Sequence, residues 1–152
     1  MSTEDGPPPE LAERLGYLFK HAQSRLTALT AEALAPHGVS AREVAVLAVL
    51  AGAEPASQQQ AARRLGIDRT SMVAFVDALE ARGLVARSPD PDDRRRNVVA
   101  VTAKGRETLR RADRARTEAE RRFLAPLSRS TADALRRALT TLAREPGRPE
   151  RL

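Results

Sequence analysis

The feature that most constrains the fold is a pair of short helices that the sequence joins by a four-residue turn. Ser57 followed by Gln60 has the spacing of a helix capping box, in which each side chain satisfies a free N–H group of the first helical turn. The turn "LGID" (65–68) ends at Asp68, a preferred N-cap residue, which predicts a second helix over 69–82. Two capped helices at this spacing are typical of a helix-turn-helix.

After the glycine that ends this pair, the hydrophobic period changes to that of strands. Segments 84–88 and 97–102 are short and rich in β-branched residues, which predicts an antiparallel hairpin. Their connecting loop, "PDPDDRRR" (89–96), is longer than the usual hairpin connection, and such loops in compact domains are more often functional. A hairpin directly after a helix-turn-helix predicts a winged helix-turn-helix.

Helical periodicity flanks this unit on both sides. Apolar residues recur at helical spacing over 10–34, and Ser40 with Glu43 predicts a further capped helix. Beyond the hairpin the same spacing resumes over 103–126, where a proline interrupts it, and a last helix is expected over 131–144. The expected fold class is therefore mainly α, with a small β-hairpin as the wing.

The composition favours a polyanionic partner. The chain carries 26 Lys and Arg against 20 Asp and Glu, a net charge of +6, which is typical of nucleic-acid-binding proteins, although GC-rich coding alone would produce the same excess of arginine. The absence of cysteine excludes disulfides, thiolate metal sites and thiol switches. The acidic, proline-rich start is unlike a signal peptide, and the longest apolar run, 44–53, is too short to span a bilayer. We expect a cytoplasmic protein that has no membrane partner, metal or cofactor.

The outward face of the predicted helix over 69–82 is suited to the major groove of DNA. Helical spacing turns four large apolar side chains inward: Met72, Phe75, Val76 and Leu79. The outward residues near the start are small, and the hydroxyls of Thr70 and Ser71 can bond to base edges or phosphates, while Ala74 can contact thymine methyl groups. An amphipathic helix with a merely solvated face remains the alternative.

The wing loop carries Arg94, Arg95 and Arg96 at its tip, next to the helix-turn-helix. Guanidinium groups suit both phosphate pairing and insertion into a narrow minor groove. We expect Asp93 to aim one of these arginines through a bidentate ion pair. A run of charges is usually a solvated loop, but its position beside the helix-turn-helix favours a DNA contact.

Taken together, four segments resemble the multiple-antibiotic-resistance regulator (MarR) family: "LGYLFKHAQSRL", "GVSAREVAVLAVL", "QQQAARRLGIDRTSMVAFVDALEARGLVAR" and "DPDDRRRNVVAVTAKG". The resemblance covers about 11–142. The wing motif that starts at Asp90 and the exit 101–105 match the family in spacing as well as in residue type, which makes the resemblance specific.

The resemblance implies an obligate homodimer on a palindromic double-stranded DNA site. It divides the chain into a disordered tail (1–9), a helical dimerisation region (10–36 and 104–145) and a winged helix-turn-helix DNA-binding lobe (37–103). Through the carry-over of family roles it assigns DNA contacts to Arg69, Thr70, Ser71, Ala74, Arg95 and the orienting Asp93. Positions 74 and 78 are often arginine in relatives but are alanine here, which shifts phosphate contact to the wing and to Arg63 or Arg64.

Relatives in this family commonly bind a small, often aromatic or phenolic, anion between the dimer helices and the DNA lobe, and binding releases the DNA. Tyr17, His21 and Arg25 share one face of the first helix and are the candidates for lining such a pocket. A surface or interface role is the alternative for His21.

The leading interpretation is a homodimeric, sequence-specific DNA-binding regulator, a repressor that a small-molecule effector releases from DNA. A winged-helix protein–protein module and a non-specific architectural DNA-binding protein are the alternatives. No nucleophile elbow, phosphate-binding glycine loop or metal-spaced His/Cys set occurs in the sequence, so we expect no enzymatic activity.

Overall fold

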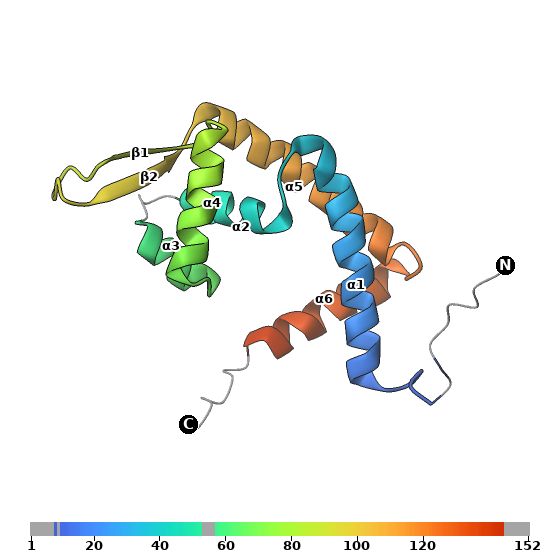
Figure 1. Ribbon diagram of the computed structural model, residues 1–152. Helices are drawn as coiled ribbons and strands as arrows, with labels where there is room; N and C mark the ends of the chain where they lie inside the picture. Colours follow the sequence, from blue (N-terminus) through green and yellow to red (C-terminus); the bar gives the residue numbers. More distant parts are fainter. Residues whose placement is uncertain (1–7, 9, 53–56, 145–152) are drawn as a thin grey trace, which may run out of the picture.

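The computed structural model describes residue 8, residues 10–52 and residues 57–144 of the chain. The elements follow in this order: α1 (Leu15–Leu34), the 3₁₀ helix η1 (Ala35–His37), α2 (Ala41–Leu50), α3 (Gln58–Leu65), α4 (Arg69–Ala81), β1 (Val85–Pro89), β2 (Asn97–Val101), α5 (Ala103–Leu124) and α6 (Arg129–Arg144) (Figure 1). This order confirms the predicted fold class, mainly α with one antiparallel hairpin. The predicted tail at 1–9 lies outside the described residues, apart from residue 8.

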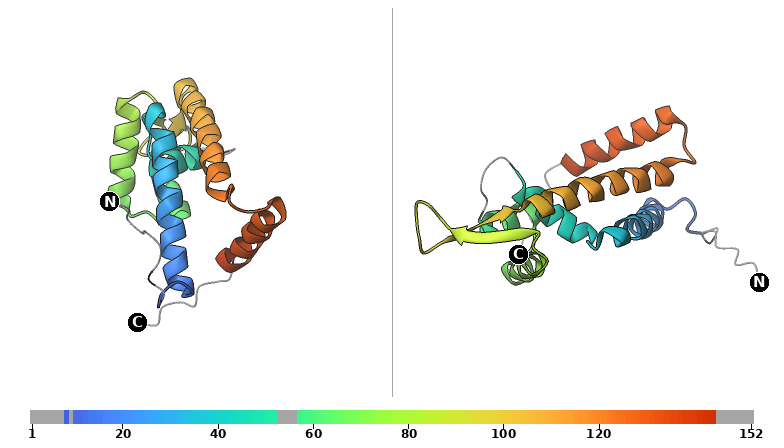
Figure 2. Two further views of the ribbon diagram at one scale, coloured as in Figure 1. Left: turned by 90° about the vertical axis from the view of Figure 1, so that its right-hand side faces the viewer. Right: turned by 90° about the horizontal axis from the view of Figure 1, so that it is seen from above.

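The elements form two groups that α5 connects. α2, α3, α4 and the hairpin gather on one side, where the hairpin projects outward, and we call this group the winged lobe (Figure 1). α5 starts at the hairpin, packs against α2 and then runs along α1. We call α1, α5 and α6 the helical region, and seen from above it extends away from the wing (Figure 2).

The hydrophobic core lies in the winged lobe. Leu47 of α2, Leu79 of α4 and Val99 of β2 are fully buried within one cluster. Leu34 at the end of α1 and Ala112 of α5 add to the same core from the helical region. Because buried side chains in a packed core hold their neighbours in place, this core provides a firm base for α4 and for the wing.

The predicted helix caps of the winged lobe are confirmed. The N–H of Ser40 donates to Glu43 Oε2 at 2.8 Å, and the N–H of Glu43 donates back to Ser40 Oγ at 3.2 Å. Ser57 and Gln60 make the same reciprocal pair at 2.9 and 3.2 Å. Asp68 Oδ1 accepts a backbone N–H of the first turn of α4 at 2.9 Å. Local sequence therefore fixes where α2, α3 and α4 begin.

The first helix begins later than the periodic pattern indicates. α1 starts at Leu15 rather than at Glu10, and the residues before it form turns, in which the N–H of Leu11 donates to Pro8 O at 2.8 Å. Arg14, at the N-cap, offers no side-chain hydrogen bond to the helix. The apolar spacing continues through these turns, so it does not mark where the helix starts. A capping residue would have marked it, and the sequence has none at this position.

Two other helix ends differ slightly from the prediction. α4 ends at Ala81 because the backbone of Arg82 (φ −92°, ψ 1°) has left the helical conformation. α6 begins at Arg129 rather than Thr131, since the Ser128 hydroxyl already accepts the N–H of Thr131 at 3.2 Å. Such shifts of one or two residues leave the architecture unchanged.

The predicted hairpin is confirmed with strands that lie within one residue of the expected segments. β1 and β2 pair antiparallel in a register that runs from Val85 opposite Val101 to Pro89 opposite Asn97. Beyond this ladder the Asp90 N–H donates to the carbonyl of the last loop arginine at 2.8 Å, which closes the base of the loop. The wing is thus a two-stranded ribbon with a closed seven-residue tip between the two strands.

The helical region joins the hairpin through a close contact at the start of α5. Thr102 caps α5, because its Oγ1 accepts the N–H of Gly105 at 3.0 Å and donates to Gly83 O at 2.7 Å. A Cβ at Gly105 would lie 2.0 Å from the carbonyl oxygen of Leu84. Only glycine therefore allows α5 to pack this closely on the start of the hairpin.

Arg82 ties the end of α4 to the connection between α1 and α2. Its guanidinium donates to Gly38 O and forms an ion pair with Glu43, the same carboxylate that caps α2. The carbonyl of Arg82 accepts from Lys104 Nζ at 2.8 Å. The C-terminal end of α4 is consequently connected to the starts of both α2 and α5.

Candidate nucleic-acid interface

α4 presents two contrasting faces, as predicted from its sequence. Met72, Val76 and Leu79 are buried, and at most 1% of the surface of each residue is exposed. Thr70 and Ala74 lie on the exposed face, next to each other along the first half of the helix. This face is small and uncharged near its start, which allows close approach to base edges.

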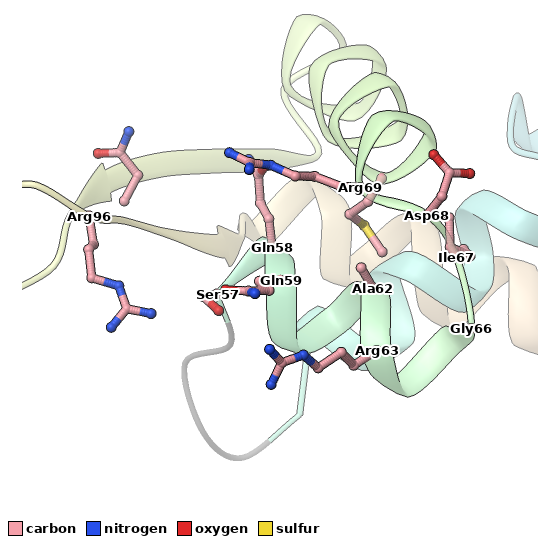
Figure 3. A pocket seen from close by; sticks show the side chains of 12 residues that line it. Ser57, Gln58, Gln59, Ala62, Arg63, Gly66, Ile67, Asp68, Arg69 and Arg96 are labelled. Carbon is pink, nitrogen blue, oxygen red and sulfur yellow. The ribbon is translucent and has the colours of Figure 1, made fainter.

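An open pocket of about 680 Å³ lies between α3, the start of α4 and the base of the wing. Three arginines from three elements border it: Arg63 of α3, Arg69 of α4 and Arg96 beside β2 (Figure 3). The remaining lining is both polar and apolar and comprises Ser57, Gln58, Gln59, Ala62, Gly66, Ile67, Asp68, Met72 and Asn97. Arginine and amide side chains converging on one hollow suit the binding of phosphate and sugar groups.

The first turn of α4 adds a helix N-terminus to this pocket. The Ser71 hydroxyl donates to Asp68 Oδ2 at 2.6 Å, and the Ser71 N–H donates to Asp68 Oδ1 at 2.9 Å. The side-chain bond first, and then the backbone bond, lower the pKa of Asp68 below its usual value of 3.8. The hydroxyl of Ser71 is thus committed to the cap, whereas Thr70, exposed beside it, retains its hydroxyl for a ligand.

The arginines of this surface differ from those of α5 in their partners. On α5, Arg110, Arg116 and Arg121 form ion pairs with glutamates one helical turn away. Within the part of the chain that the structure describes, no ion pair forms at any of six lobe arginines: Arg63, Arg64, Arg69, Arg94, Arg95 and Arg96. Among the described residues, the positive charge of these six arginines is therefore not neutralised by ion pairs and is available to an anionic partner.

The acids of the wing loop organise its backbone, which corrects the prediction for Asp93. Asp93 Oδ1 accepts the N–H of Arg95 at 3.0 Å, and Asp90 Oδ1 accepts the N–H of Asp92 at 2.9 Å. Asp93 forms no ion pair with a wing arginine among the described residues. Short acidic side chains bond most easily to nearby amides in tight turns, so the exposed guanidinium groups of Arg94 and Arg95 stay free of the loop.

The structure brings together only part of the predicted set, and it adds residues. Arg63, Arg69 and Arg96 meet at the pocket, whereas Arg64 is exposed on α3 outside its lining. Gln58, which sequence reasoning missed, borders the pocket from the first turn of α3. The sequence held no local signal for it, because Gln58 reaches the pocket only through the packing of α3 beside α4 and the wing.

A second pocket, of about 910 Å³, lies where α1, the start of α2 and α5 meet. Its lining is mainly apolar, from Leu26, Ala31 and Val39. The charged residues at its border are Arg42 and the ion pair of Arg116 with Glu120. This is the expected location, between the helical region and the winged lobe. The lining residues differ from those expected.

Tyr17, His21 and Arg25 lie outside the second pocket. The rings of Tyr17 and His21 stack with centroids 4.1 Å apart, and the Arg25 guanidinium lies 5.8 Å from the ring centroid of Phe123. They do share one face of α1, as predicted. Because Arg25 turns toward α5, it joins the two long helices rather than opening a cavity.

Residues 8, 10–52 and 57–144 contain neither a metal-binding cluster nor a single helix suited to crossing a membrane. No group of three or more His, Cys, Asp or Glu side chains there could hold a metal ion. No single helix there is long and apolar enough to cross a membrane; α1 and η1 together with α2 have the length and composition, but they meet at a bend of 69°.

Comparison with a family model matches residues 37–96 to the MarR family. These residues cover α2, α3, α4, β1 and the wing loop. The chain is 31% identical over 101 residues to the HTH-type transcriptional repressor NicR of Pseudomonas putida, and this alignment covers 66% of the chain and 64% of NicR. The chain thus spans less than two thirds of the length of that relative.

Solved structures extend the similarity over most of the chain. It resembles the transcriptional repressor CouR bound to a 23-mer DNA duplex, with 41% identity, a TM-score of 0.79 and coverage of 90% of this chain and 96% of CouR. CouR bound to p-coumaroyl-CoA gives 38% identity and a TM-score of 0.77, with coverage of 91% of this chain and 98% of CouR. A MarR-family regulator of Rhodococcus sp. RHA1 gives 30% identity and a TM-score of 0.76, with coverage of 91% of this chain and 100% of that regulator.

Proposed function

Because the chain belongs to the MarR family of transcriptional regulators, we propose that it represses transcription as a homodimer bound to a palindromic double-stranded DNA operator. The observation that carries this proposal is the set of arginines without ion pairs on α3, α4 and the wing, beside the small outward face of α4. Phosphate contacts position a protein on DNA and base contacts give specificity. The two kinds of surface lie side by side here.

The proposed contacts divide between the two grooves. α4 would enter the major groove, with Thr70 and Ala74 facing base edges and Arg69 at the helix start near a phosphate. Arg95 of the wing would reach the adjacent minor groove, where narrow, electronegative segments attract guanidinium groups. Arg63 and Arg96, on either side of the pocket, would hold the intervening backbone.

Exposed apolar side chains on the helical region support the homodimer. Leu15 and Phe19 of α1 are 68% and 44% exposed, and Leu142 of α6 is 59% exposed. α6 has no buried residue, although its apolar residues recur at helical spacing. A helix with an uncovered apolar stripe is stabilised when a partner covers it. We propose that the apolar faces of residues 10–36 and 104–145, and not the charged face of α5 on which Arg121 pairs with Glu118, form the dimer interface, and that residues 37–103 bind DNA.

The oligomeric state is directly measurable. Sedimentation of the intact chain should give twice its mass of 16.5 kDa. Leu139→Asp places a charge on the exposed apolar side of α6 and should yield monomers, whereas Thr141→Asp, on the opposite side of the same helix, should not. A monomeric wild type, or a dimeric Leu139→Asp variant, would contradict the proposed interface.

DNA binding is tested by fluorescence anisotropy with the DNA upstream of the protein's own coding sequence and with a scrambled duplex, at several salt concentrations. A specific regulator should prefer its own site by about 10³-fold or more. An architectural protein would bind both duplexes equally with a steep salt dependence, and a protein–protein module would bind neither.

The wing contact is tested by one substitution and a matched control. Arg95→Ala should weaken operator binding by roughly 10- to 100-fold while the dimer stays folded. Arg121→Ala removes the same charge from α5, where Glu118 already pairs with it, and should leave operator affinity within a factor of two. Equal effects of the two substitutions would remove the wing from the interface.

We further propose that an aromatic acyl anion in the second pocket releases the DNA. The pocket volume lies within the roughly 300–1,000 Å³ of small-molecule sites, and CouR, at 38% identity, binds p-coumaroyl-CoA. Arg42 borders the pocket and forms no ion pair among the described residues, so it is available to an anionic group. A ligand between the two parts of the molecule would change the spacing of the paired α4 helices, which DNA fixes at about 34–36 Å.

This effector proposal is tested with p-coumarate and p-coumaroyl-CoA added to the preformed operator complex. Release by either compound supports an aromatic acyl effector, and the two arms distinguish the free acid from the thioester. Arg42→Ala should raise the concentration needed by roughly 10-fold or more, while Arg121→Ala should not change it. If neither compound releases the DNA at millimolar concentration, the effector class is wrong.

A further inference from the structure

One arginine of the wing faces the protein instead of the solvent. Arg87, in the middle of β1, points its guanidinium at α4, where it forms ion pairs with Asp77 and Glu80. The backbone N–H of Arg87 also donates to Glu80 Oε1 at 3.1 Å. Its side chain is only 23% exposed. The strand is therefore attached to α4 through both its backbone and its side chain.

The same guanidinium reaches α3. With the Gln58 amide oriented so that its oxygen faces the arginine, this oxygen accepts from Arg87 Nε at 2.9 Å and from Nη2 at 3.1 Å. Gln58 also borders the pocket between α3, α4 and the wing. Arg87 thus connects the three elements that surround this pocket.

The chemistry of the contact makes it persistent. Partial burial disfavours the charged guanidinium, but the hydrogen bonds that it donates to Asp77 and Glu80 outweigh this effect and raise the pKa of Arg87. The two carboxylates and the amide accept hydrogen bonds from all three nitrogens of the planar guanidinium. A lysine ammonium would not reproduce this arrangement.

The outer part of the wing depends on such a contact, because the hydrophobic core holds only its inner part. An isolated two-stranded hairpin is marginally stable in water. The strands are anchored by the buried side chains of Val85, Val99 and Val101, but Ser88 and residues 91–96 are exposed. Arg87 lies opposite Val99 in the ladder, between the buried inner part of the ribbon and its exposed outer part.

We propose that Arg87 is a positioning residue for DNA binding: it clamps the wing to α4 and α3, so that Arg94 and Arg95 reach the backbone while α4 lies in the groove. This role rests on the proposed DNA-binding function. The clamp acts before DNA arrives. A direct phosphate contact by Arg87 is the competing role, and it would require the guanidinium to leave both carboxylates.

The two roles differ in the protein without DNA. The chain has no cysteine, so Asp92→Cys introduces a single site for a nitroxide spin label at the exposed wing tip. Electron paramagnetic resonance then measures the mobility of the tip in the DNA-free full-length protein. In this labelled background, Arg87→Gln should increase the mobility of the tip, and the control Arg121→Gln should not.

The second variant removes the two carboxylate charges and keeps the arginine. Asp77→Asn with Glu80→Gln leaves Arg87 charged but without its two ion-pair partners, so a direct phosphate contact predicts unchanged or tighter operator binding. The clamp predicts the opposite: a mobile wing tip and operator affinity reduced by roughly 10-fold or more, as for the loss of a specific arginine contact. Arg87→Gln should lose a similar amount, with thermal melting used to confirm that each variant is folded.

Three outcomes would overturn the clamp: an unchanged tip mobility in Arg87→Gln, operator binding by the Asp77/Glu80 variant as tight as by the wild type, or equal losses in Arg87→Gln and Arg121→Gln. If Arg87→Gln does not fold, the Asp77/Glu80 variant decides alone. A wild type that does not prefer its operator would contradict the proposed function instead, while the DNA-free mobility measurement would still test the clamp.

Discussion

Replacing Gly105 with alanine should destabilise the protein, although the position lies in a helix where alanine normally gains about 0.5–1 kcal/mol over glycine. The new Cβ would lie 2.0 Å from the carbonyl oxygen of Leu84 and 2.7 Å from Val101 Cγ1. Ordinary contacts between carbon and carbonyl oxygen lie at about 3.3–3.6 Å, so the two groups must separate by roughly 1.3 Å.

The carbonyl of Leu84 cannot move without loss. It accepts the N–H of Thr102 at 3.0 Å and the Thr102 hydroxyl at 3.2 Å, the bonds that attach α5 to the hairpin. Overpacking costs about 1–3 kcal/mol and each hydrogen bond about 0.5–1.5 kcal/mol, so the expected loss is about 3–5 kcal/mol. In a chain of this size that lowers the melting temperature by about 6–20 °C.

Thermal unfolding followed by circular dichroism measures this change. Arg106→Ala, at the exposed neighbouring position of α5, is the control and should stay within about 0.5 kcal/mol of the wild type. Adding Val101→Ala to Gly105→Ala should not restore stability, because it removes the side-chain contact and leaves the backbone oxygen in place. A Gly105→Ala variant that melts at or above the wild type would refute this reasoning.

Three other substitutions test the winged lobe. Ala74→Arg adds a cation to the exposed face of α4 and should tighten binding to any duplex, with a salt slope steeper by about 0.9 for each new phosphate contact; weaker operator binding in the anisotropy assay would mean that this position faces bases. Glu43→Gln keeps the cap of α2 but weakens the pair with Arg82, and should lower the free energy of unfolding in urea by about 1–2 kcal/mol; an unchanged midpoint would contradict a role for that pair. Because the folded-state pKa of Asp68 is lowered, its stabilising effect is present above its usual value of 3.8 and is lost as the pH falls through the lower folded value. Asp68→Asn should therefore flatten the acid limb of a melting-temperature profile measured from pH 7 to pH 3, and two parallel profiles would argue against the cap.

The sequence predicted the parts of the lobe that depend on local interactions. Ser40, Ser57 and Asp68 cap helices where expected, because a capping hydrogen bond joins residues only three positions apart. The inward and outward faces of α4 followed from its 3.6-residue period. The start of α1 did not follow, since the periodic pattern continues through the turns before Leu15.

The roles of charged residues were harder to predict, because the same residue type serves opposite purposes. Arg87 and Arg95 both lie in the hairpin and loop, yet Arg87 pairs with two carboxylates of α4, while Arg95 is exposed without an ion pair among the described residues. Asp93 bonds to a backbone amide instead of a guanidinium. Which partner a long side chain reaches depends on elements that are distant in the sequence.

By itself, the sequence determined the order and type of the elements, the winged helix-turn-helix and the excess of arginine, because caps, periods and turns act over a few residues. Only the tertiary structure decided which arginines meet around the pocket beside α4, that Gln58 and Arg87 join three elements there, and that the second pocket is lined by residues other than Tyr17, His21 and Arg25. These outcomes depend on how α3, α4, α5 and the hairpin pack around a common core, which brings together side chains that no local pattern relates.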